Sequence, residues 1–333
     1  MTVKLAINGF GRIGRNVLRA LMEQAPGDLE VVAINDLAPL ETNAHLFEFD
    51  SVHGRYGHAV TLGENTIDVG RGPIRITAER EPDKLPWDDV DIALECTGFF
   101  RTPELAARHL KNGSKRVLIS APAKGDIKTV VYGVNHDQIT AQDQILSNAS
   151  CTTNCLVPVA HVLHAQFGIL RGHMTTVHSY TGTQPVHDRA HKDLYRARAA
   201  ALSMIPTTTG AAQTLGVVLP HLDGLITGTA IRVPTPNVSC CDLVVETKTP
   251  ASVEEINAAM QTAADGPLQG VLAVDPRKLV SMDFNHDPHS AIFASDQTAI
   301  QQDNLVRVLI WYDNEWAFSN RMLDTSRVIA SHL

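Results

Sequence analysis

The sequence predicts an α/β protein of two domains, in which a doubly wound parallel sheet precedes an α+β domain with a mostly antiparallel sheet. Three observations lead to this prediction. Short apolar runs alternate with helical patterns over residues 3–150, as they do where helices connect parallel strands. A glycine-rich turn separates the first strand pattern from the first helix pattern. After Cys151 the strand-like runs lengthen and follow one another more directly, which favours antiparallel pairing.

We expect the elements of the first domain, residues 1–150, in the following order. Val3–Asn8 is a short apolar strand, Arg12–Gln24 has apolar residues at helical spacing, and Glu30–Asn35 is a second strand. Three further strands are expected where apolar runs lie near Gly or Pro: Asp91–Cys96, Arg116–Ser120 and Val130–Tyr132.

The second domain, residues 151–315, is expected to open with a helix that begins at Cys151 and continues over Leu156–Phe167, interrupted by Pro158. Five β-like stretches follow this helix: Gly172–Ser179, Leu225–Val233, Ser239–Lys248, Leu279–Phe284 and Leu305–Trp311. The closing segment, Trp316–His332, has a helical pattern.

Composition excludes several classes of protein. The chain has 333 residues, of which 44% are hydrophobic and 19% charged, and its net charge is −8, which argues against binding nucleic acid through a broad basic face. No apolar run reaches the ~18 residues of a membrane span, and the N-terminus lacks the pattern of a signal peptide. Five cysteines do not suggest a disulfide framework. We therefore expect a cytoplasmic protein without nucleic-acid or membrane partners.

The glycine-rich turn predicts a dinucleotide site. Glycine triplets occur in many turns, but a position between a strand and a helix is the context that dinucleotide binding requires. Gly9 permits the tight turn, Gly11 lets the backbone approach a pyrophosphate, and Gly14 lets helix and strand pack closely. Asp36 ends the second strand, where a carboxylate can accept a hydrogen bond from an adenosine ribose hydroxyl. These residues predict a Rossmann-type domain that binds NAD.

Cys151 is the predicted nucleophile. It follows the polar run Ser147–Ser150 at the start of a helix, where backbone N–H groups and the helix dipole stabilise a thiolate. Cys155 lies one turn further on, and the two thiols superficially resemble a metal or redox pair. Because no second pair stands at ligand spacing, we expect no metal there. The other cysteines fall in apolar strands and are expected to be packing residues: Cys96, Cys240 and Cys241.

His178 is the predicted base. It ends the β-branched run Thr175–Val177 and precedes the loop Tyr180–Asp188, so that the fold could bring it beside the thiol and let it take the thiol proton. Most histidines in a chain with fifteen have no such role. The segment Asn285–His289 holds metal-ligand residue types, but its Asp-Pro pair is better explained by a turn, and we expect no metal site.

Phosphate-binding groups are predicted in two places. The run Thr207–Gly210 offers clustered hydroxyls and backbone N–H groups, which bind phosphate oxygens, although a helix cap after Pro206 would use the same residues. Three arginines supply guanidinium groups for planar recognition of phosphate: Arg196, Arg198 and Arg232.

Taken together, five longer motifs make the chain resemble the phosphorylating glyceraldehyde-3-phosphate dehydrogenases over essentially its whole length. The motifs are Ala6–Arg15, Asn148–Cys155, Pro206–Ala212, Arg232–Val238 and Trp311–Trp316. The resemblance implies NAD as the cofactor, a homotetramer, and a closing helix, residues 316–333, that packs on the first domain.

The resemblance also implies roles for individual residues. The catalytic pair would be Cys151 and His178. The phosphate of the substrate would be held by Thr181 and Arg232, and inorganic phosphate by Ser150, Thr152, Arg196, Thr209 and Gly210. The cofactor would be contacted by Gly9, Phe10, Gly11, Arg12, Ile13, Asp36, Arg80, Ser120 and Asn314, the last at the nicotinamide carboxamide.

The reaction implied is the oxidation of D-glyceraldehyde 3-phosphate to 1,3-bisphosphoglycerate. Cys151 would attack the aldehyde, His178 would take the hydroxyl proton as hydride leaves, and phosphate would attack the thioester. Two alternatives remain open: an erythrose-4-phosphate dehydrogenase on the same fold, and a non-catalytic nucleotide-binding adaptor. The adaptor is disfavoured because it would need neither Cys151 nor His178.

Cofactor choice depends on two residues. A carboxylate at Asp36 would repel the 2′-phosphate of NADP, so NAD is expected to be preferred. Arg189 and Ala190 stand where many NAD-specific relatives have an apolar residue and a proline. In the resembling family this loop reaches the adenosine end of a neighbouring subunit's cofactor. Arg189 would then partly offset the repulsion and permit NADP as a secondary cofactor.

Overall fold

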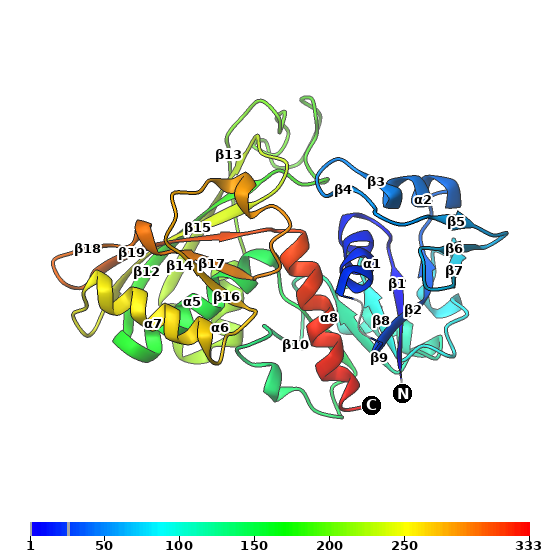
Figure 1. Cartoon of the computed structure of the whole chain (residues 1–333), viewed down its shortest axis with the longest axis horizontal. Helices are drawn as coiled ribbons and strands as arrows, with labels where there is room; N and C mark the ends of the chain where they lie inside the picture. The colour runs from blue at the N-terminus through cyan, green and yellow to red at the C-terminus, as the bar shows by residue number, and fades with distance from the viewer. Residues whose placement is uncertain (1, 25–26) are drawn as a thin grey trace. The chain divides into compact units, whose positions relative to one another are not determined.

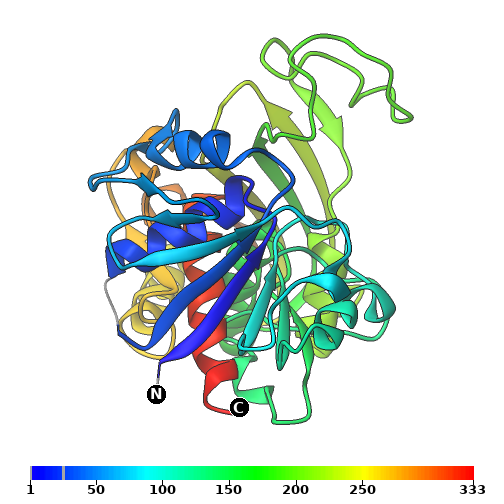
Figure 2. The same ribbon diagram turned by 90° about the vertical axis from the view of Figure 1, so that its right-hand side faces the viewer.

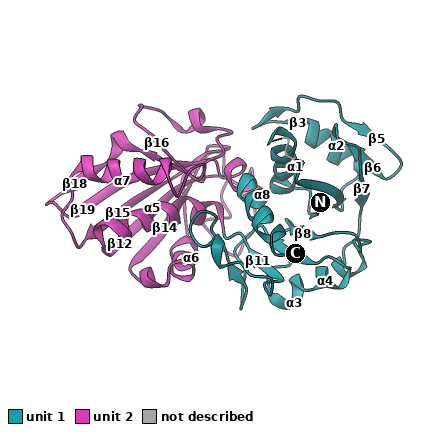
Figure 3. Ribbon diagram, turned by 60° about the horizontal axis from the view of Figure 1, so that its bottom comes forward, with its two compact units in different colours: residues 1–149, 319–333 teal, residues 150–318 magenta. Residues whose placement is uncertain are grey.

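The computed structural model describes residues 2–24 and 27–333. The chain folds as two compact units, Met1–Ala149 with Ser319–Leu333, called unit 1, and Ser150–Phe318, called unit 2 (Figure 3). Unit 1 is built on a mainly parallel sheet and unit 2 on a mostly antiparallel one, with helices in both, so the predicted fold class is confirmed.

The sheet of unit 1 has the strand order β10-β11-β9-β8-β1-β2-β7-β6-β5. β1 pairs in parallel with β2 on one side and β8 on the other, whereas β5 and β6 pair antiparallel at one edge. Figure 2 shows this sheet with β1 and β2 in blue. Its strands are β1 (Val3–Asn8), β2 (Leu29–Asn35), β5 (Thr61–Leu62), β6 (Thr66–Asp68), β7 (Pro73–Thr77), β8 (Ile92–Glu95), β9 (Arg116–Ile119), β10 (Lys128–Thr129) and β11 (Ile145–Ser147).

Strand order places the candidate dinucleotide site. From β1 the chain continues to β2 and later to β7 on one side of β1, and it then crosses to β8 on the other side, so the order reverses beside β1. Asn8, at the carboxyl end of β1, is in register with Asn35 of β2 and Glu95 of β8. In open α/β sheets, ligands bind outside the carboxyl ends of the strands at such a reversal.

Helices cover this sheet because their apolar residues recur on one face. In α1, Val17, Leu18 and Leu21 are buried. The last part of α8 packs on α1 within unit 1, where Gln24 Nε2 donates a hydrogen bond of 2.5 Å to Asn320 Oδ1. The helical segments are α1 (Arg12–Gln24), α2 (Leu40–Glu48), η1 (Pro82–Lys84), α3 (Pro103–Ala106), α4 (Arg108–Lys111), η2 (His136–Gln138) and α8 (Trp316–Ala330), and a small ribbon joins β3 (Phe49–Asp50) to β4 (Gly54–Arg55).

The sheet of unit 2 has the order β13-β14-β12-β15-β19-β17-β16, with β18 added beside β19. β12 pairs in parallel with β14, and β16 with β17, while the other neighbours are antiparallel. The strands are β12 (Ile169–Ser179), β13 (Ile205–Thr207), β14 (Ile226–Val233), β15 (Ser239–Thr247), β16 (Leu272–Asp275), β17 (Ala291–Ala294), β18 (Ala299–Gln301) and β19 (Leu305–Tyr312).

One face of this sheet carries the core. Alternate residues of β19 are buried, as expected for a strand with one face against helices. The helical segments of unit 2 are α5 (Cys151–Phe167), α6 (Ala211–Val218), η3 (Pro220–Leu222), α7 (Val253–Asp265), η4 (Ser281–Phe284) and η5 (Ser295–Gln297). Figure 1 shows α5, α6 and α7 gathered along the sheet, and residues 180–204, in green, extending away from it. Figure 2 shows the same projecting loop.

Two expected strands are wrong. At Val130–Tyr132, the Val131 N–H donates to the side chain of Asn135 (2.8 Å), and the Asn135 N–H donates to the Val131 carbonyl (3.2 Å). A turn therefore replaces the expected strand pairing. At Leu279–Phe284, Asp283 accepts from the Val280 N–H through its side chain (2.8 Å) and donates its own N–H to the Val280 carbonyl (3.0 Å). Local side-chain bonds therefore outweigh the strand propensity of both segments.

The interruption expected at Pro158 is also wrong, because α5 is continuous from Cys151 to Phe167 with the proline inside it. Pro158 and most of its neighbours in the helix are buried, and this packing offsets the lost backbone hydrogen bond. Among the described residues, the helices are all too short or too polar to cross a lipid bilayer.

Candidate active site

A thiol and an imidazole meet in unit 2. Cys151 is the first residue of α5 and His178 is the penultimate residue of β12. The Cys151 Sγ lies 3.5 Å from the His178 Nε2. The structure therefore brings together the two residues that the sequence predicts as nucleophile and base.

The backbone before Cys151 determines where the thiol lies. Ala149 has φ of 58°, in the left-handed region, which costs a non-glycine residue about 1–2 kcal/mol. Ser150 then caps the helix, because its hydroxyl accepts the Thr153 N–H at 3.1 Å. The Asn154 amide donates to the Ser150 carbonyl at 2.9 Å. These bonds hold Cys151 in the first helical turn, next to N–H groups that have no partner within the helix.

Burial controls the acid–base properties of the pair. It raises the pKa of the Cys151 thiol, although the Arg232 charge and hydrogen bonds involving Thr152 act in the opposite direction. Burial also lowers the pKa of His178 to about 3, and the Arg232 charge adds to this effect. Burial therefore favours the neutral form of both groups. It opposes the thiolate expected at the helix start, which the helix dipole and the Arg232 charge favour.

The other ring nitrogen of His178 has two neighbours. The parallel register of β12 and β14 puts His178 opposite Arg232. His178 Nδ1 lies 2.7 Å from the Ser179 carbonyl oxygen and 2.6 Å from Arg232 Nη1. Arg232 Nη1 in turn donates to the Ser179 carbonyl at 2.8 Å. The three atoms form a nearly equilateral triangle, which we call the Nδ1 triangle.

Arg196 lies close to this group. Its Nε donates to the Thr207 hydroxyl at 2.9 Å and lies 3.6 Å from the Asp193 carboxylate. Burial lowers the pKa of Arg232, and the charge of Arg196 contributes in the same direction. Two guanidinium groups that repel one another favour an anion between them. The pair is thus suited to phosphate.

The predicted hydroxyl ligands differ in availability. Thr209 and Gly210 stand at the start of α6, where the Thr209 hydroxyl accepts the Ala211 N–H at 3.2 Å and a Cβ on Gly210 would meet no atom within 4 Å. The Thr181 hydroxyl lies in the exposed loop, 3.0 Å from that of Thr183. These groups are open to a ligand.

The hydroxyls of Ser150 and Thr152, in contrast, already have internal partners. Ser150 caps α5, and the Thr152 hydroxyl lies 2.9 Å from that of Tyr312. Thr152 is only 5% exposed. If these two residues contact phosphate, their backbone N–H groups are the available donors.

A cavity of about 520 Å³ lies at the carboxyl ends of the strands in unit 1. The glycines fit a dinucleotide there. Gly9 has φ of 94°, and a Cβ on it would come within 2.8 Å of the Thr97 nitrogen, whereas a Cβ on Gly14 would lie 2.2 Å from the Gly9 carbonyl. At Gly11, which lines the cavity, a Cβ would meet no atom within 4 Å. The backbone can therefore approach a ligand at Gly11.

Asp36 is held rigidly at this cavity. One carboxylate oxygen accepts the Phe10 N–H at 2.8 Å and the other accepts the Ala38 N–H at 2.9 Å. The cavity is also lined by Arg80, which is exposed. Since Asp36 cannot turn away without breaking both bonds, a 2′-phosphate would meet a fixed negative charge.

Four predicted cofactor contacts of unit 1 are not among the described residues that line this cavity: Phe10, Arg12, Ile13 and Ser120. Arg12 forms an ion pair with Asp50. Burial alone would raise the pKa of Asp50, but the Arg12 hydrogen bond and two backbone N–H groups lower it to about 2. Arg12 thus has a structural partner in the protein by itself.

Asn314, in unit 2, is oriented by two serines. Its side-chain oxygen accepts from the hydroxyls of Ser179 at 2.7 Å and Ser239 at 2.9 Å. The amide NH₂ of Asn314 is therefore the group left to contact a ligand.

Sequence reasoning missed several residues that support the site. Tyr312 joins Thr152 to Thr176 through its hydroxyl, with both distances 2.9 Å, and its ring meets that of His178 edge-on. Glu95 is fully buried and accepts hydrogen bonds from Asn8 and Thr97, which line the cavity. The available signal was a polar residue ending an otherwise apolar strand.

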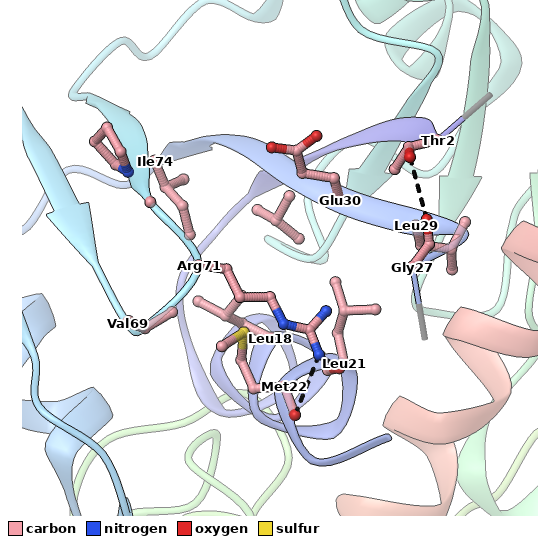
Figure 4. Close-up of a pocket in the computed structure, with 13 residues that line it drawn as sticks. Thr2, Leu18, Leu21, Met22, Gly27, Leu29, Glu30, Val69, Arg71 and Ile74 are labelled. Atoms are coloured by element: carbon pink, nitrogen blue, oxygen red, sulfur yellow. Dashed lines mark hydrogen bonds between the residues drawn. The ribbon is translucent and has the colours of Figure 1, made fainter. Parts of the chain in front are cut away.

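The remaining candidates stay separate from this chemistry. His289 pairs with Asp287 at 2.8 Å, and no cluster of three metal-ligand side chains is found in the part of the chain that the structure describes. Cys155, Cys240 and Cys241 are buried. A further cavity of about 190 Å³ in unit 1 lies between α1, β2 and the start of β7, with Arg71 in its wall (Figure 4). It contains none of the predicted site residues.

Comparison with known proteins places this geometry in a family. Residues 3–103 match the family model "Glyceraldehyde 3-phosphate dehydrogenase, NAD binding domain", and residues 150–314 match "Glyceraldehyde 3-phosphate dehydrogenase, C-terminal domain". The chain is similar to the glyceraldehyde-3-phosphate dehydrogenases of Cereibacter sphaeroides (64% identity over 98% of each chain), Xanthobacter flavus (61%, 98% of each) and Geobacillus stearothermophilus (52%, 99% of each). With its glycine cradle, its thiol–imidazole pair and these matches along nearly all its length, the chain belongs to the glyceraldehyde-3-phosphate dehydrogenase family of NAD-dependent oxidoreductases.

Proposed function

We propose that this protein oxidises D-glyceraldehyde 3-phosphate with NAD and inorganic phosphate to 1,3-bisphosphoglycerate. The observation that carries the proposal is the 3.5 Å approach of Cys151 Sγ to His178 Nε2 at the first turn of α5. The relatives cited above carry the name of this activity, and the match of residues 3–103 to an NAD binding domain supports the cofactor.

The thiol performs the first step. As Cys151 Sγ bonds to the aldehyde carbon, His178 Nε2 accepts the thiol proton, and the negative carbonyl oxygen is met by the Cys151 N–H. His178 gives this proton to the oxygen, which forms the hydroxyl of the adduct, and takes it back as the hydride leaves. NAD, when bound, supplies the acceptor for the hydride that leaves the same carbon. A thioester on Cys151 remains, and its carbon is attacked by phosphate, which releases the thiol.

Two groups of residues bind the anions in this proposal. Thr181 and Arg232 hold the phosphate of the substrate. Inorganic phosphate is bound by Ser150, Thr152, Arg196, Thr209 and Gly210, with backbone donors from the first two. The mutual repulsion of Arg196 and Arg232 supports this assignment, because an anion relieves it.

Of the cofactor contacts proposed for unit 1, Gly9, Gly11, Asp36 and Arg80 line the cavity. Gly9, Phe10 and Gly11 form the pyrophosphate cradle, Arg12, Ile13 and Ser120 support it, and Asp36 and Arg80 serve the adenosine half. The NH₂ of Asn314 orients the nicotinamide carboxamide. Their arrangement favours NAD, and Arg189 admits NADP as a secondary cofactor.

We further propose that residues 1–150, with the closing helix 316–333, form the dinucleotide-binding domain and that residues 151–315 form the catalytic domain. The protein is proposed to act as a cytoplasmic homotetramer. Light scattering of the purified protein tests the assembly, and a mass other than four protomers contradicts it.

The activity is tested by following NADH formation with D-glyceraldehyde 3-phosphate, with and without inorganic phosphate. We expect sustained turnover only with phosphate, since the thioester otherwise accumulates on Cys151. D-Erythrose 4-phosphate is assayed in parallel. Faster turnover of the four-carbon aldehyde, independent of phosphate, would assign the chain to the alternative activity. Absence of turnover with both aldehydes, while NAD still binds, would favour the adaptor.

A further inference from the structure

The main chain at Asn314 is fixed by the residue before it. Asp313 lies in the turn between β19 and α8 and is fully buried. One of its carboxylate oxygens accepts the Trp316 N–H at 2.8 Å, at the start of α8. The other accepts the His286 N–H and the side-chain amide of Asn237, both at 2.7 Å. The side chain of Asn314 therefore extends from a backbone that is bonded to other segments of unit 2.

Two buried serines meet one end of this side chain. Ser179 is the last residue of β12 and Ser239 is the first residue of β15. Their hydroxyl oxygens lie 2.7 Å and 2.9 Å from Asn314 Oδ1. The Ser179 N–H donates to the Ser239 hydroxyl at 3.1 Å, and the two hydroxyls are 3.3 Å apart. We call these two residues the serine clamp.

The number of hydroxyl protons decides which end of the amide faces the serine clamp. With Oδ1 there, each hydroxyl donates its proton to this oxygen, and the Ser239 oxygen accepts the Ser179 N–H. If the amide is reversed, its NH₂ donates to the hydroxyls, and one of the two hydroxyl protons is left without an acceptor among the described residues. Ser179 and Ser239 are 0% and 1% exposed, so water cannot replace that acceptor. An unpaired buried donor disfavours the reversed amide by roughly 5- to 150-fold.

The NH₂ of Asn314 is consequently turned away from the serine clamp. Among the described residues, the hydrogen bonds of the Asn314 side chain all go to its oxygen. An amide NH₂ donates hydrogen bonds and does not accept them. A ligand group that binds it must therefore be an acceptor.

We infer that the serine clamp determines how the cofactor is recognised: it presents Asn314 as a donor, so that the nicotinamide is held through the oxygen of its carboxamide and not through the carboxamide NH₂. This inference rests on the proposed function, in which Asn314 orients the nicotinamide carboxamide. Ser179 and Ser239 are positioning residues, because they act through Asn314. A cofactor that keeps a carbonyl oxygen at this place on the ring is accepted, and its NH₂ is dispensable.

Substitutions can separate the serine clamp from the substrate site. The Ser179 carbonyl, which accepts from Arg232 Nη1 at 2.8 Å, belongs to the main chain and is retained in Ser179→Ala. Asn314→Asp keeps the oxygen that the clamp holds and replaces the NH₂ by an oxygen that cannot donate. Ser326→Ala is the matched control, because it removes an equally buried hydroxyl whose hydrogen bond of 2.7 Å goes to the Met322 carbonyl.

Isothermal titration calorimetry of the whole protein tests the inference with three probes. NAD carries both the carbonyl oxygen and the NH₂ of the carboxamide. Its 3-acetylpyridine analogue keeps the oxygen and has a methyl group in place of the NH₂, and ADP-ribose lacks the ring. We expect the parent and Ser326→Ala to bind NAD and the analogue with similar affinity, since Asn314 contacts only the oxygen that both carry.

Each single variant of the serine clamp should weaken NAD binding by roughly 2- to 12-fold, the contribution of one hydrogen bond, and leave ADP-ribose binding unchanged. Asn314→Asp should also weaken NAD and spare ADP-ribose. In the double variant, Ser179→Ala with Ser239→Ala, the amide is free to turn, and its oxygen can accept from the NH₂ of NAD. This variant should bind NAD more tightly than the analogue, a change of preference that a merely structural role would not produce.

Much weaker binding of the analogue than of NAD by the parent overturns the inference, because the carboxamide NH₂ is then recognised, and this result does not depend on any variant folding. Equal losses of NAD and ADP-ribose affinity in the variants of the serine clamp also overturn it. If the same parent preparation oxidises D-glyceraldehyde 3-phosphate with NAD, only the inference about the clamp is wrong and the proposed function stands. If the parent binds neither NAD nor ADP-ribose, both fail.

Discussion

The acid sensitivity of the folded protein should depend on His178. Burial and the Arg232 charge lower the pKa of this residue to about 3 from its ordinary value of 6.5. Above pH 6.5 the residue is neutral in both the folded and the unfolded chain and contributes no pH dependence. As the pH falls from 6.5 toward 3, the unfolded chain binds a proton that the folded chain refuses, so the free energy of unfolding decreases. The loss is roughly 2 kcal/mol at pH 5 and approaches roughly 5 kcal/mol below pH 3.

The perturbation is His178→Asn, which removes the titrating group. Urea unfolding at pH 7 and pH 5, at one protein concentration because assembly affects apparent stability, gives the loss for each variant. The parent should lose about 2 kcal/mol per protomer more than the variant between these pH values. His187→Asn is the control, since His187 is exposed in the loop after β12 and its replacement should leave the loss of the parent unchanged. Equal losses in the parent and His178→Asn would refute the argument that burial keeps this imidazole neutral.

Three further predictions concern chemistry and stability. Cys151→Ser should abolish phosphate-dependent aldehyde oxidation but retain NAD binding in a fluorescence titration; residual activity above a few per cent, with contaminating parent excluded, contradicts its role as the nucleophile. Arg189→Leu should reduce kcat/KM for NADP while leaving that for NAD nearly unchanged, and an equal loss with both cofactors means that the side chain contacts neither phosphate. Asp50→Asn should lower the free energy of unfolding at pH 7 by roughly 2 kcal/mol, because the stability gained from the low pKa of Asp50 is present above pH 4 and is lost toward pH 2. If the variant loses as much stability as the parent between pH 4 and pH 2, the Arg12–Asp50 pair is not the source of the acid sensitivity.

Local patterns predicted the fold class because they depend on residues close together in the chain. Val3–Asn8, the glycine turn and Arg12–Gln24 specify a strand, a turn and a helix in succession, and the structure has them at those bounds. The same reasoning was wrong at Val130–Tyr132 and Leu279–Phe284. Their apolar residues suit a strand, but the side chains of Asn135 and Asp283 satisfy the backbone N–H groups locally, and strand propensity carries no information about that competition.

In the candidate site, too, some features could be predicted from the sequence and others could not. The sequence by itself determined the family, the glycine turn and the choice of Cys151 and His178, because the reactive residue types lie in long motifs whose local structure is readable. Only the tertiary structure decided their state. Because β12 pairs with β14 and α5 packs beside them, the thiol lies 3.5 Å from the imidazole and Arg232 contacts the far side of the ring. The same packing buries both groups, which favours their neutral forms. Electrostatic and hydrogen-bond effects depend on distance and solvent access, and these exist only once remote parts of the chain have been brought together.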